Sequence, residues 1–184
     1  MKTVRVLIFL LVALAQLSLP GWAAWKRGQT LAHGRVWKLK TEPVDPVDAV
    51  RGRYIWLQYA IEEFPQSERV DWKSPVYVVL KEGADGFAQI DRINQDRVRG
   101  DNVVQADASG WSDDGKQSLY FPFRKYWVTE KIAPEAERAY RENSRRGKEN
   151  AYVTVRVRDG DAAIEELYID NQPLRDYLRA HSTR

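Results

Sequence analysis

The sequence contains no cysteine and only two histidines. Without cysteine, a disulfide framework, a thiolate nucleophile and a cysteine-based zinc site are all excluded. His33 follows an N-terminal apolar run and His181 lies near the C-terminal end, so neither side chain predicts a general base. The nucleophile-elbow pattern Gly-x-Ser-x-Gly is also missing. We therefore expect a non-enzymatic protein that needs no cofactor and no metal.

The chain also has little net charge. The formal charge is +3 over 184 residues, and acidic and basic side chains are interspersed. A nucleic-acid-binding protein would gather lysine and arginine on one face, so no nucleic-acid partner is expected. A chain of this length with 43% hydrophobic residues can bury one core. The totals predict a single domain with a short appendage.

The appendage is the N-terminal segment 1–25, a basic start followed by an apolar run. Residues 6–25 are long enough to cross a hydrocarbon core of about 30 Å as a helix. Trp22 and Trp25, followed by two basic residues, are typical of the interface between membrane and water. This pattern favours an uncleaved anchor, and a signal peptide cleaved after one of the alanines that follow Trp22 is the alternative. Residues 26–184 then form the exported domain.

Most of this domain has the period-two alternation of β-strands. In Arg35–Thr41, Trp37 and Leu39 share one face. Tyr54–Ile61 is apolar on both faces, which is typical of a central strand covered on both sides. Further strands are expected at 75–81, 87–93, 119–128, 151–158 and 162–169. Four of them form two hairpins around glycine-containing turns, 75–81 with 87–93 and 151–158 with 162–169, and Pro122 requires an edge position, a bulge or a bend in 119–128.

Helices are few in the exported domain. Pro134–Arg146 has proline in its first turn, acidic residues near its start, basic residues near its end, and Gly147 as a natural stop. Its narrow apolar stripe places it on the surface of a sheet, and Leu174–Arg184 predicts a short helical tail. The fold class is α+β: a predominantly antiparallel, barrel-like β domain with one surface helix, preceded by a single N-terminal transmembrane or signal helix.

Three enzymatic or metal-binding alternatives are weaker than their structural explanations. Lys73 and Ser74 are adjacent in a loop, which is a poor basis for a serine–lysine nucleophile. The acidic residues between 45 and 63 match no EF-hand spacing, so a calcium site is weakly supported. A hydrolase with an acidic site near Glu130, which closes an aromatic run that includes Tyr126, is the third function considered.

Tryptophans offer a different kind of site. In an exported domain an exposed tryptophan can stack on sugar rings. Trp72 and Trp111 occur in polar loops and are the candidates for such a contact, whereas core packing is the simpler explanation of Trp56 and Trp127. The alternative function is therefore an exported binding module for cell-wall glycan or another extracellular ligand.

The segment from Gly52 to Tyr59 resembles the naming motif of the GDYXXLXY family of small bacterial proteins. The similarity continues through the Pro-x-Asp-Pro-x-Asp approach before the motif, the aromatic run ending at Glu130, and the hairpin at 152–169. The residues that carry the motif and its approach are Pro43, Asp45, Pro46, Asp48, Arg51, Gly52, Arg53, Tyr54, Leu57 and Tyr59. The resemblance implies a membrane-associated protein, often encoded beside polytopic membrane proteins, and it brings no established activity.

Two positions depart from the family pattern. Arg53 stands where the motif has aspartate, and Lys131 where glycine is expected. Reversing the charge at position 53 would disable a catalytic carboxylate, so the simpler interpretation is that this position was never catalytic. The motif strand is then structural, and any local function is expected on the rim of the polar corner 45–51.

Together these patterns predict an accessory domain for an integral membrane protein. The N-terminal helix would hold it in the membrane, with the domain outside the cytoplasm and on the periplasmic side of the inner membrane in a Gram-negative cell. The candidate interaction residues are Trp72, Trp111, Tyr126 and Glu130. The pattern predicts no particular oligomeric state.

Overall fold

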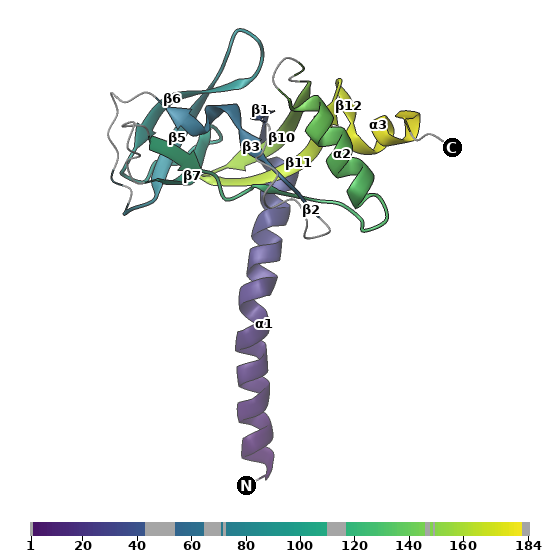
Figure 1. The fold of residues 1–184 in the computed structure, drawn as a ribbon. Coiled ribbons are helices and arrows are strands. Elements are labelled where there is room, and N and C mark those ends of the chain that lie inside the picture. The colour runs from purple at the N-terminus through teal and green to yellow at the C-terminus, as the bar shows by residue number, and fades with distance from the viewer. Residues whose placement is uncertain are drawn as a thin grey trace.

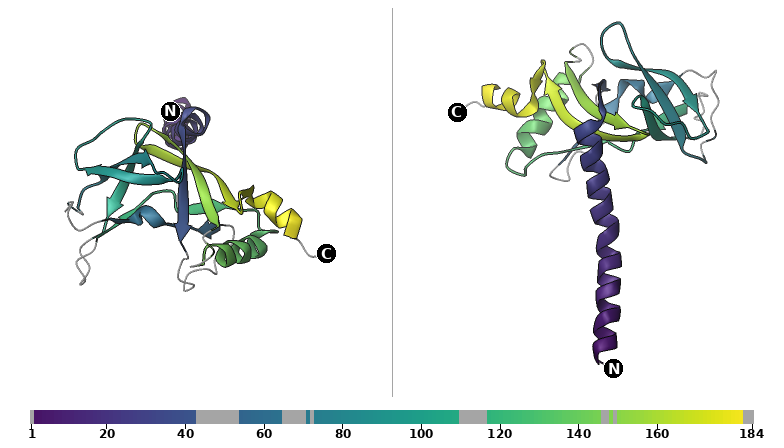
Figure 2. Two further views of the ribbon diagram at one scale, coloured as in Figure 1. Left: turned by 90° about the horizontal axis from the view of Figure 1, so that it is seen from above. Right: turned by 180° about the vertical axis from the view of Figure 1, so that it is seen from behind.

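The computed structural model describes residues 2–42, 54–64, 71, 73–109, 117–145, 148 and 150–181. A long helix, α1 (Lys2–His33), leads into a domain of short strands and two further helices, α2 (Ala133–Asn143) and α3 (Leu174–His181) (Figure 1). The rest of the described chain gathers at the C-terminal end of α1, which projects away from it (Figure 2). The predicted α+β class with an N-terminal helix is confirmed.

The described strands form antiparallel sheets that curl into a half-barrel (Figure 2). In the order in which the strands lie side by side, the first sheet contains β12 (Gln172–Pro173), β11 (Asp161–Ile169), β10 (Ala151–Arg158), β1 (Arg35–Glu42) and β3 (Gln58–Tyr59). The second sheet contains β2 (Tyr54–Trp56) and β9 (Lys125–Trp127). The third sheet contains β4 (Glu63–Phe64), β8 (Gln117–Tyr120), β7 (Val103–Ala108), β5 (Val76–Glu82) and β6 (Ala88–Asn94). The predicted hairpins correspond to β5–β6 and β10–β11.

The tip of the β10–β11 hairpin joins two of the sheets. Asp159 and Gly160 both have positive φ, 51° and 93°, as a tight two-residue hairpin turn requires. The carbonyl of Gly160 accepts a hydrogen bond of 3.0 Å from the amide of Gln105, beside a parallel bridge between Gly160 and Val104. This contact ties the first sheet to β7 of the third and so closes the curl.

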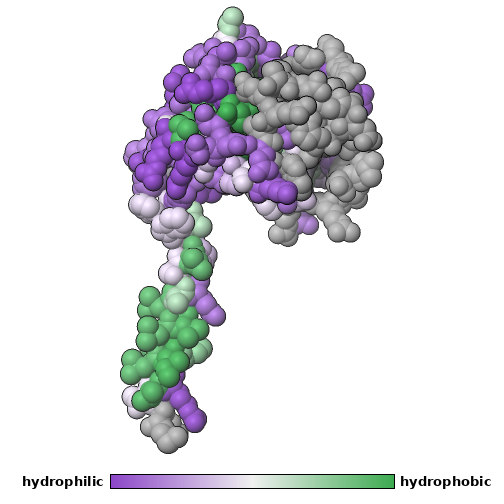
Figure 3. All heavy atoms as spheres, turned by 90° about the vertical axis from the view of Figure 1, so that its left-hand side faces the viewer, coloured by the Kyte–Doolittle hydropathy of each residue, from purple (hydrophilic) through white to green (hydrophobic). Residues whose placement is uncertain are grey.

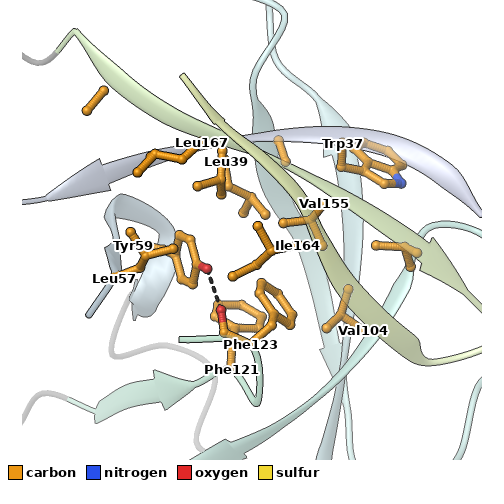
Figure 4. Packing of buried hydrophobic residues seen from close by; sticks show 14 of the residues in the cluster. Trp37, Leu39, Leu57, Tyr59, Val104, Phe121, Phe123, Val155, Ile164 and Leu167 are labelled. Carbon is orange, nitrogen blue, oxygen red and sulfur yellow. Dashed lines mark hydrogen bonds between the residues drawn. The ribbon is translucent and has the colours of Figure 1, made fainter. Parts of the chain in front are cut away.

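The hydrophobic core fills the inside of the curl (Figure 4). Trp37 and Leu39 enter it from β1 with 4% and 1% exposure, so the inward face predicted for this strand is confirmed. Leu57 and Tyr59 enter it from the family motif. The Tyr59 hydroxyl donates a hydrogen bond of 2.6 Å to the carbonyl of Phe123, which satisfies its one polar atom within the core (Figure 4).

The motif strand is covered on one face only, so the prediction of a central strand is wrong. Ile55 and Leu57 are buried, but Trp56 between them is 40% exposed. The strand β2 ends at Trp56, and one further hydrogen bond of 2.8 Å, from the amide of Leu57 to the carbonyl of Arg124, continues its pairing with the segment before β9. The chain continues through β3 into a 3₁₀ turn, η2 (Ala60–Glu62). The apolar residues on the outer face of this strand are therefore exposed on the surface, and core packing does not account for their presence.

The predicted bend at Pro122 is confirmed, because it separates β8 from β9. The predicted helix at 134–146 forms as α2 but ends three residues early, at Asn143. There the Asn143 carbonyl accepts the amide of Asn150 at 3.0 Å, and its side-chain amide donates to the carbonyl of Ala139 at 2.8 Å. Local hydrogen bonds made by Asn143 therefore mark the end of α2.

The helix α1 continues into the domain through residues 29–33. Lys26 forms an ion pair of 2.7 Å with Asp161 at the start of β11, and Thr30 is 3% exposed. At Gly34 the helix ends, and a Cβ there would lie 2.5 Å from the carbonyl oxygen of Thr30 and 3.0 Å from that of Val157. Packing against β10 and β11 keeps the chain helical up to a turn that only glycine fits.

The other end of α1 is apolar and uncovered. Within the described residues, Thr3–His33 is a single helix that is both long enough and apolar enough to cross a membrane. No part of its most apolar stretch is buried. Figure 3 shows this surface as a hydrophobic band on α1, beside the mostly hydrophilic described surface of the domain. The helix is consistent with a membrane anchor, and a signal sequence would have the same composition.

Candidate functional site

Several predicted site residues lie outside the described part of the chain, and their roles stay predictions. These are Pro43, Asp45, Pro46, Asp48, Arg51, Gly52, Arg53, Trp72 and Trp111. Of the others, Leu57 and Tyr59 are core residues with 0% and 1% exposure. Tyr54 and Tyr126 lie on the paired strands β2 and β9, where Ile55 is opposite Tyr126.

A buried ion pair follows the motif in the sequence. Arg124 Nη2 lies 2.5 Å from Glu62 Oε2, and the two side chains are 17% and 4% exposed. Nη2 also donates to the carbonyl of Leu119 at 3.3 Å. Glu62 Oε1 and Arg124 Nε have no hydrogen-bond partner among the described residues. The hydrogen bonds of the ion pair therefore replace only part of the hydration that the two side chains lose on burial.

This incomplete compensation changes the protonation of Glu62. Burial raises the pKa of Glu62 from 4.5 to about 7, and the neighbouring Arg124 guanidinium offsets only part of that rise. Burial also raises the pKa values of Tyr59 and Tyr140, both of which are sensitive to the charge on Glu62. The interior beside the motif therefore disfavours a negative charge.

The free energy of unfolding should fall as the pH rises through about 7. In the unfolded chain Glu62 ionises near its ordinary pKa of 4.5, whereas the folded protein keeps the proton until about 7. The folded state thus binds more protons between these values, and the full loss is roughly 3 kcal/mol. Denaturant unfolding of the full chain in detergent, between about pH 5 and pH 8, would measure it. E62Q should lack this component, E137Q should keep it, and parallel pH profiles of E62Q and wild type would contradict the assignment.

Aromatic side chains cover the outer face of β2 and β9. The Tyr54 and Trp127 rings meet edge to face with centroids 5.3 Å apart, and Trp56 is next to Tyr54. Lys125 Nζ lies 4.8 Å from the Tyr54 ring centroid and 5.5 Å from that of Trp56. Trp56 is 40% and Trp127 63% exposed. We call these four residues the aromatic surface, and Figure 1 shows β2 on the side of the domain from which α1 leaves.

Next to the aromatic surface is a cleft between α1, β9, β11 and α3, with a volume of about 380 Å³. We call it the basal cleft, and it is lined by Arg27, Lys125, Tyr126, Trp127, Ile164, Glu165, Glu166 and Arg175. Three of these side chains are cationic and two are anionic. The cleft therefore combines charged groups with one exposed tryptophan at the root of the N-terminal helix.

Both carboxylates of the basal cleft are already engaged. Glu165 Oε1 accepts two hydrogen bonds from Arg156, at 2.9 Å from Nε and 2.7 Å from Nη2. Glu166 Oε1 accepts the Tyr126 hydroxyl and the amide of Leu167, the latter at 3.0 Å. Burial and the Glu166 charge together raise the pKa of Tyr126, which keeps it a hydrogen-bond donor. The acids of the cleft are thus held in place by these hydrogen bonds, and its three cations outnumber them by one.

Glu130 does not take part in this cleft. It is exposed in the turn before α2, where its carbonyl accepts the amide of Ala133 at 3.4 Å. Among the described residues, no group of three histidine, aspartate or glutamate side chains is placed to hold a metal ion. The structure therefore separates two of the predicted interaction residues, Tyr126 inside the cleft and Glu130 outside it.

The sequence did not single out the three cations of the basal cleft. Arg27, Lys125 and Arg175 are far apart in the chain, and only the packing of α1 and α3 beside β9 brings them together. One local signal was available, since Lys125 is a lysine embedded in an aromatic run. A cation in that setting can be held by neighbouring ring faces, as Lys125 is.

The fold and the cleft define a class: a curled antiparallel β domain on one N-terminal apolar helix, with its charged cleft where the helix meets the domain. The chain belongs to the GDYXXLXY family, because the family model described as GDYXXLXY protein matches residues 16–167. The family resemblance seen in the sequence is thereby confirmed. Comparison with curated proteins and with solved structures found no match.

Proposed function

We propose that the protein is a membrane-anchored, non-enzymatic accessory domain that partners an integral membrane protein outside the cytoplasm. The observation that carries this proposal is the continuity between α1 and the domain. The apolar run lies in α1, and only Gly34 separates α1 from the first strand, β1. The Lys26–Asp161 ion pair and the buried Thr30 hold that junction.

A rigid junction favours a partner in the membrane over a distant ligand. A flexible linker lets a domain search a volume, whereas a helix without a linker fixes both its height and its direction. The exposed tryptophans of the described chain also support a partner near the membrane. Trp127 lines the same cleft as Arg27, which lies two residues beyond Trp25 on α1. A surface in this place is poorly sited for binding the cell wall.

The apolar run supports the rest of the proposal. Its side chains are about half or more exposed, as in Leu7 at 59% and Leu14 at 71%, so they need lipid or another apolar helix around them. The basic start of the chain supports a cytoplasmic N-terminus, which places the domain on the other side. A helix from a polytopic membrane protein would provide a partner within the bilayer.

Site-specific photo-crosslinking in native membranes would test the partner. With a crosslinker in place of Trp127, on the membrane side, we expect covalent capture of an integral membrane protein in amounts comparable to the protein itself. With the crosslinker in place of Lys81, on the distal β5–β6 hairpin and 53% exposed, we expect none. The difference should be about tenfold or more, because only one position faces the bilayer.

Two outcomes would contradict the proposal. Equal capture from both positions would show random collision, and capture of lipid alone from the Trp127 position would show a domain without a protein partner. The full chain is used throughout, and its unfolding transition in detergent serves as the control for folding of each variant.

A further inference from the structure

The side chains that line the basal cleft have more positive than negative charges. Its two carboxylates are bound to Arg156, Tyr126 and the backbone, as described above. Arg27, Lys125 and Arg175 make no ion pair with any described residue. With the carboxylates of Glu165 and Glu166, the lining of this cleft of about 380 Å³ has three cations and two anions, and a bound anion would neutralise the remaining positive charge.

The position of the cleft along α1 indicates where that anion comes from. Arg27 follows Trp25 by two residues, which is about 3 Å along a helix axis. Tryptophans of this kind mark the edge of the hydrocarbon layer, and the polar layer beyond it is about 5–8 Å thick. Arg27 therefore lies at the depth of the lipid headgroups. Because Arg27 lines the cleft, the cleft opens into the same layer.

The uncharged side chains of the cleft fit a lipid as well. Trp127, which is 63% exposed, and Ile164 both line the cleft. An indole ring with one apolar face and one polar edge is suited to the boundary between headgroup and acyl chain. The Tyr126 residue belongs to the same lining. The cleft thus offers cations to a phosphate and apolar surface to the part of the molecule that follows it.

We propose that the basal cleft binds the headgroup phosphate of an anionic phospholipid, through Arg27, Lys125 and Arg175. Arginine can contact two phosphate oxygens at once, and Lys125 provides a point charge held in place by the Tyr54 and Trp56 rings. The lining has a net positive charge, so the site prefers lipids with a net negative charge over zwitterionic ones. The bound lipid would support the domain where it rests on the membrane. This inference rests on the membrane anchoring within the proposed function, and it needs no protein partner.

Lipid enrichment around the purified full chain would test the proposal. The protein is reconstituted into nanodiscs of phosphatidylcholine with a minor fraction of phosphatidylglycerol and extracted in mild detergent. The lipids that stay bound are then counted by native mass spectrometry. We expect phosphatidylglycerol to be enriched over its share of the bilayer. Each cleft cation removed should lower the enrichment about fivefold, as expected for a basic residue near an anionic surface.

The variant K125Q/R175Q removes two cleft cations and leaves the anchor helix unchanged. Its matched control is K81Q/R92Q, which removes two exposed cations from the distal β5–β6 hairpin and changes the net charge equally. We expect K125Q/R175Q to lose the enrichment and K81Q/R92Q to keep it. Wild-type enrichment in K125Q/R175Q, or an equal loss in both variants, would overturn the proposal. All four positions are exposed, so unfolding transitions close to wild type are expected for both variants.

A second arm distinguishes lipid from soluble phosphate. Glycerol 3-phosphate in large excess should leave the enrichment unchanged, because it lacks the acyl chains that hold the lipid in the headgroup layer. Complete displacement by glycerol 3-phosphate would overturn the assignment to a lipid. A chain that fails to enter nanodiscs would contradict the anchoring itself, whereas a chain that enters without enrichment would contradict the lipid site alone.

Discussion

Replacing Arg124 by methionine should destabilise the folded protein by about 3–5 kcal/mol at pH 8.5, because it leaves the Glu62 carboxylate buried without its counter-ion. At pH 5.5 the loss should be much smaller. Since the pKa of Glu62 is about 7 even beside Arg124, the carboxyl is already neutral at the lower pH. Denaturant unfolding of the full chain in detergent at the two pH values would measure both losses.

Two further variants make this result specific. The double variant R124M/E62Q removes both charges and should recover most of the stability lost at pH 8.5, because no uncompensated charge remains in the interior. The variant R141M breaks the exposed ion pair between Arg141 and Glu137 on α2 and should cost less than about 1 kcal/mol. A loss in R124M that is the same at both pH values would contradict the account of a buried charge.

Replacing Leu57 by alanine should cost between about 2 and 5 kcal/mol of unfolding free energy. Leu57 has 0% exposure and packs in the core beside Tyr59, so the shorter side chain leaves a cavity that the surrounding strands cannot fill (Figure 4). Because Leu57 is a defining position of the family motif, this experiment tests whether the motif encodes the fold. Thermal or denaturant unfolding of the full chain would show the effect.

The neighbouring Trp56 supplies the matched control from within the motif. It occupies one of the unspecified positions and is 40% exposed, so W56A should cost about 1 kcal/mol or less despite removing a larger side chain. A loss from W56A as large as that from L57A would contradict a one-sided motif strand. L57M should keep most of the stability, since it nearly conserves the volume of the side chain.

The sequence was sufficient for the elements whose faces differ clearly. Period-two alternation located β1 and both strands of the β10–β11 hairpin, and the Asp159–Gly160 pair marked the turn between them. The alternation wrongly placed Trp56 and Trp127 in the core. A strand that is apolar on both faces has the same sequence pattern whether its second face contacts protein or another environment. Only the pairing of β2 with β9 in a separate two-stranded sheet decides that.

The candidate site was harder to predict because it is assembled from distant segments. The basal cleft needs α1, β9, β11 and α3 at once, and no periodicity relates them. The continuation of α1 past residue 28 has the same origin, since contacts with β10 and β11 keep a polar segment helical. Glu62 is one of the acidic residues between 45 and 63, and its burial beside Arg124 follows from the 3₁₀ turn after the motif.

The unbroken helix has a consequence for how the protein faces its surroundings. Each residue in a helix turns the chain by about 100° and advances it by about 1.5 Å. Because α1 runs without interruption from the apolar run to Gly34, the number of residues between them would fix the direction in which the domain faces in the membrane plane under the proposed anchoring. One inserted residue would barely change the height of the domain but would swing the basal cleft by more than a quarter of a turn. The length of this helix thus determines the orientation of the domain about the helix axis as well as its height.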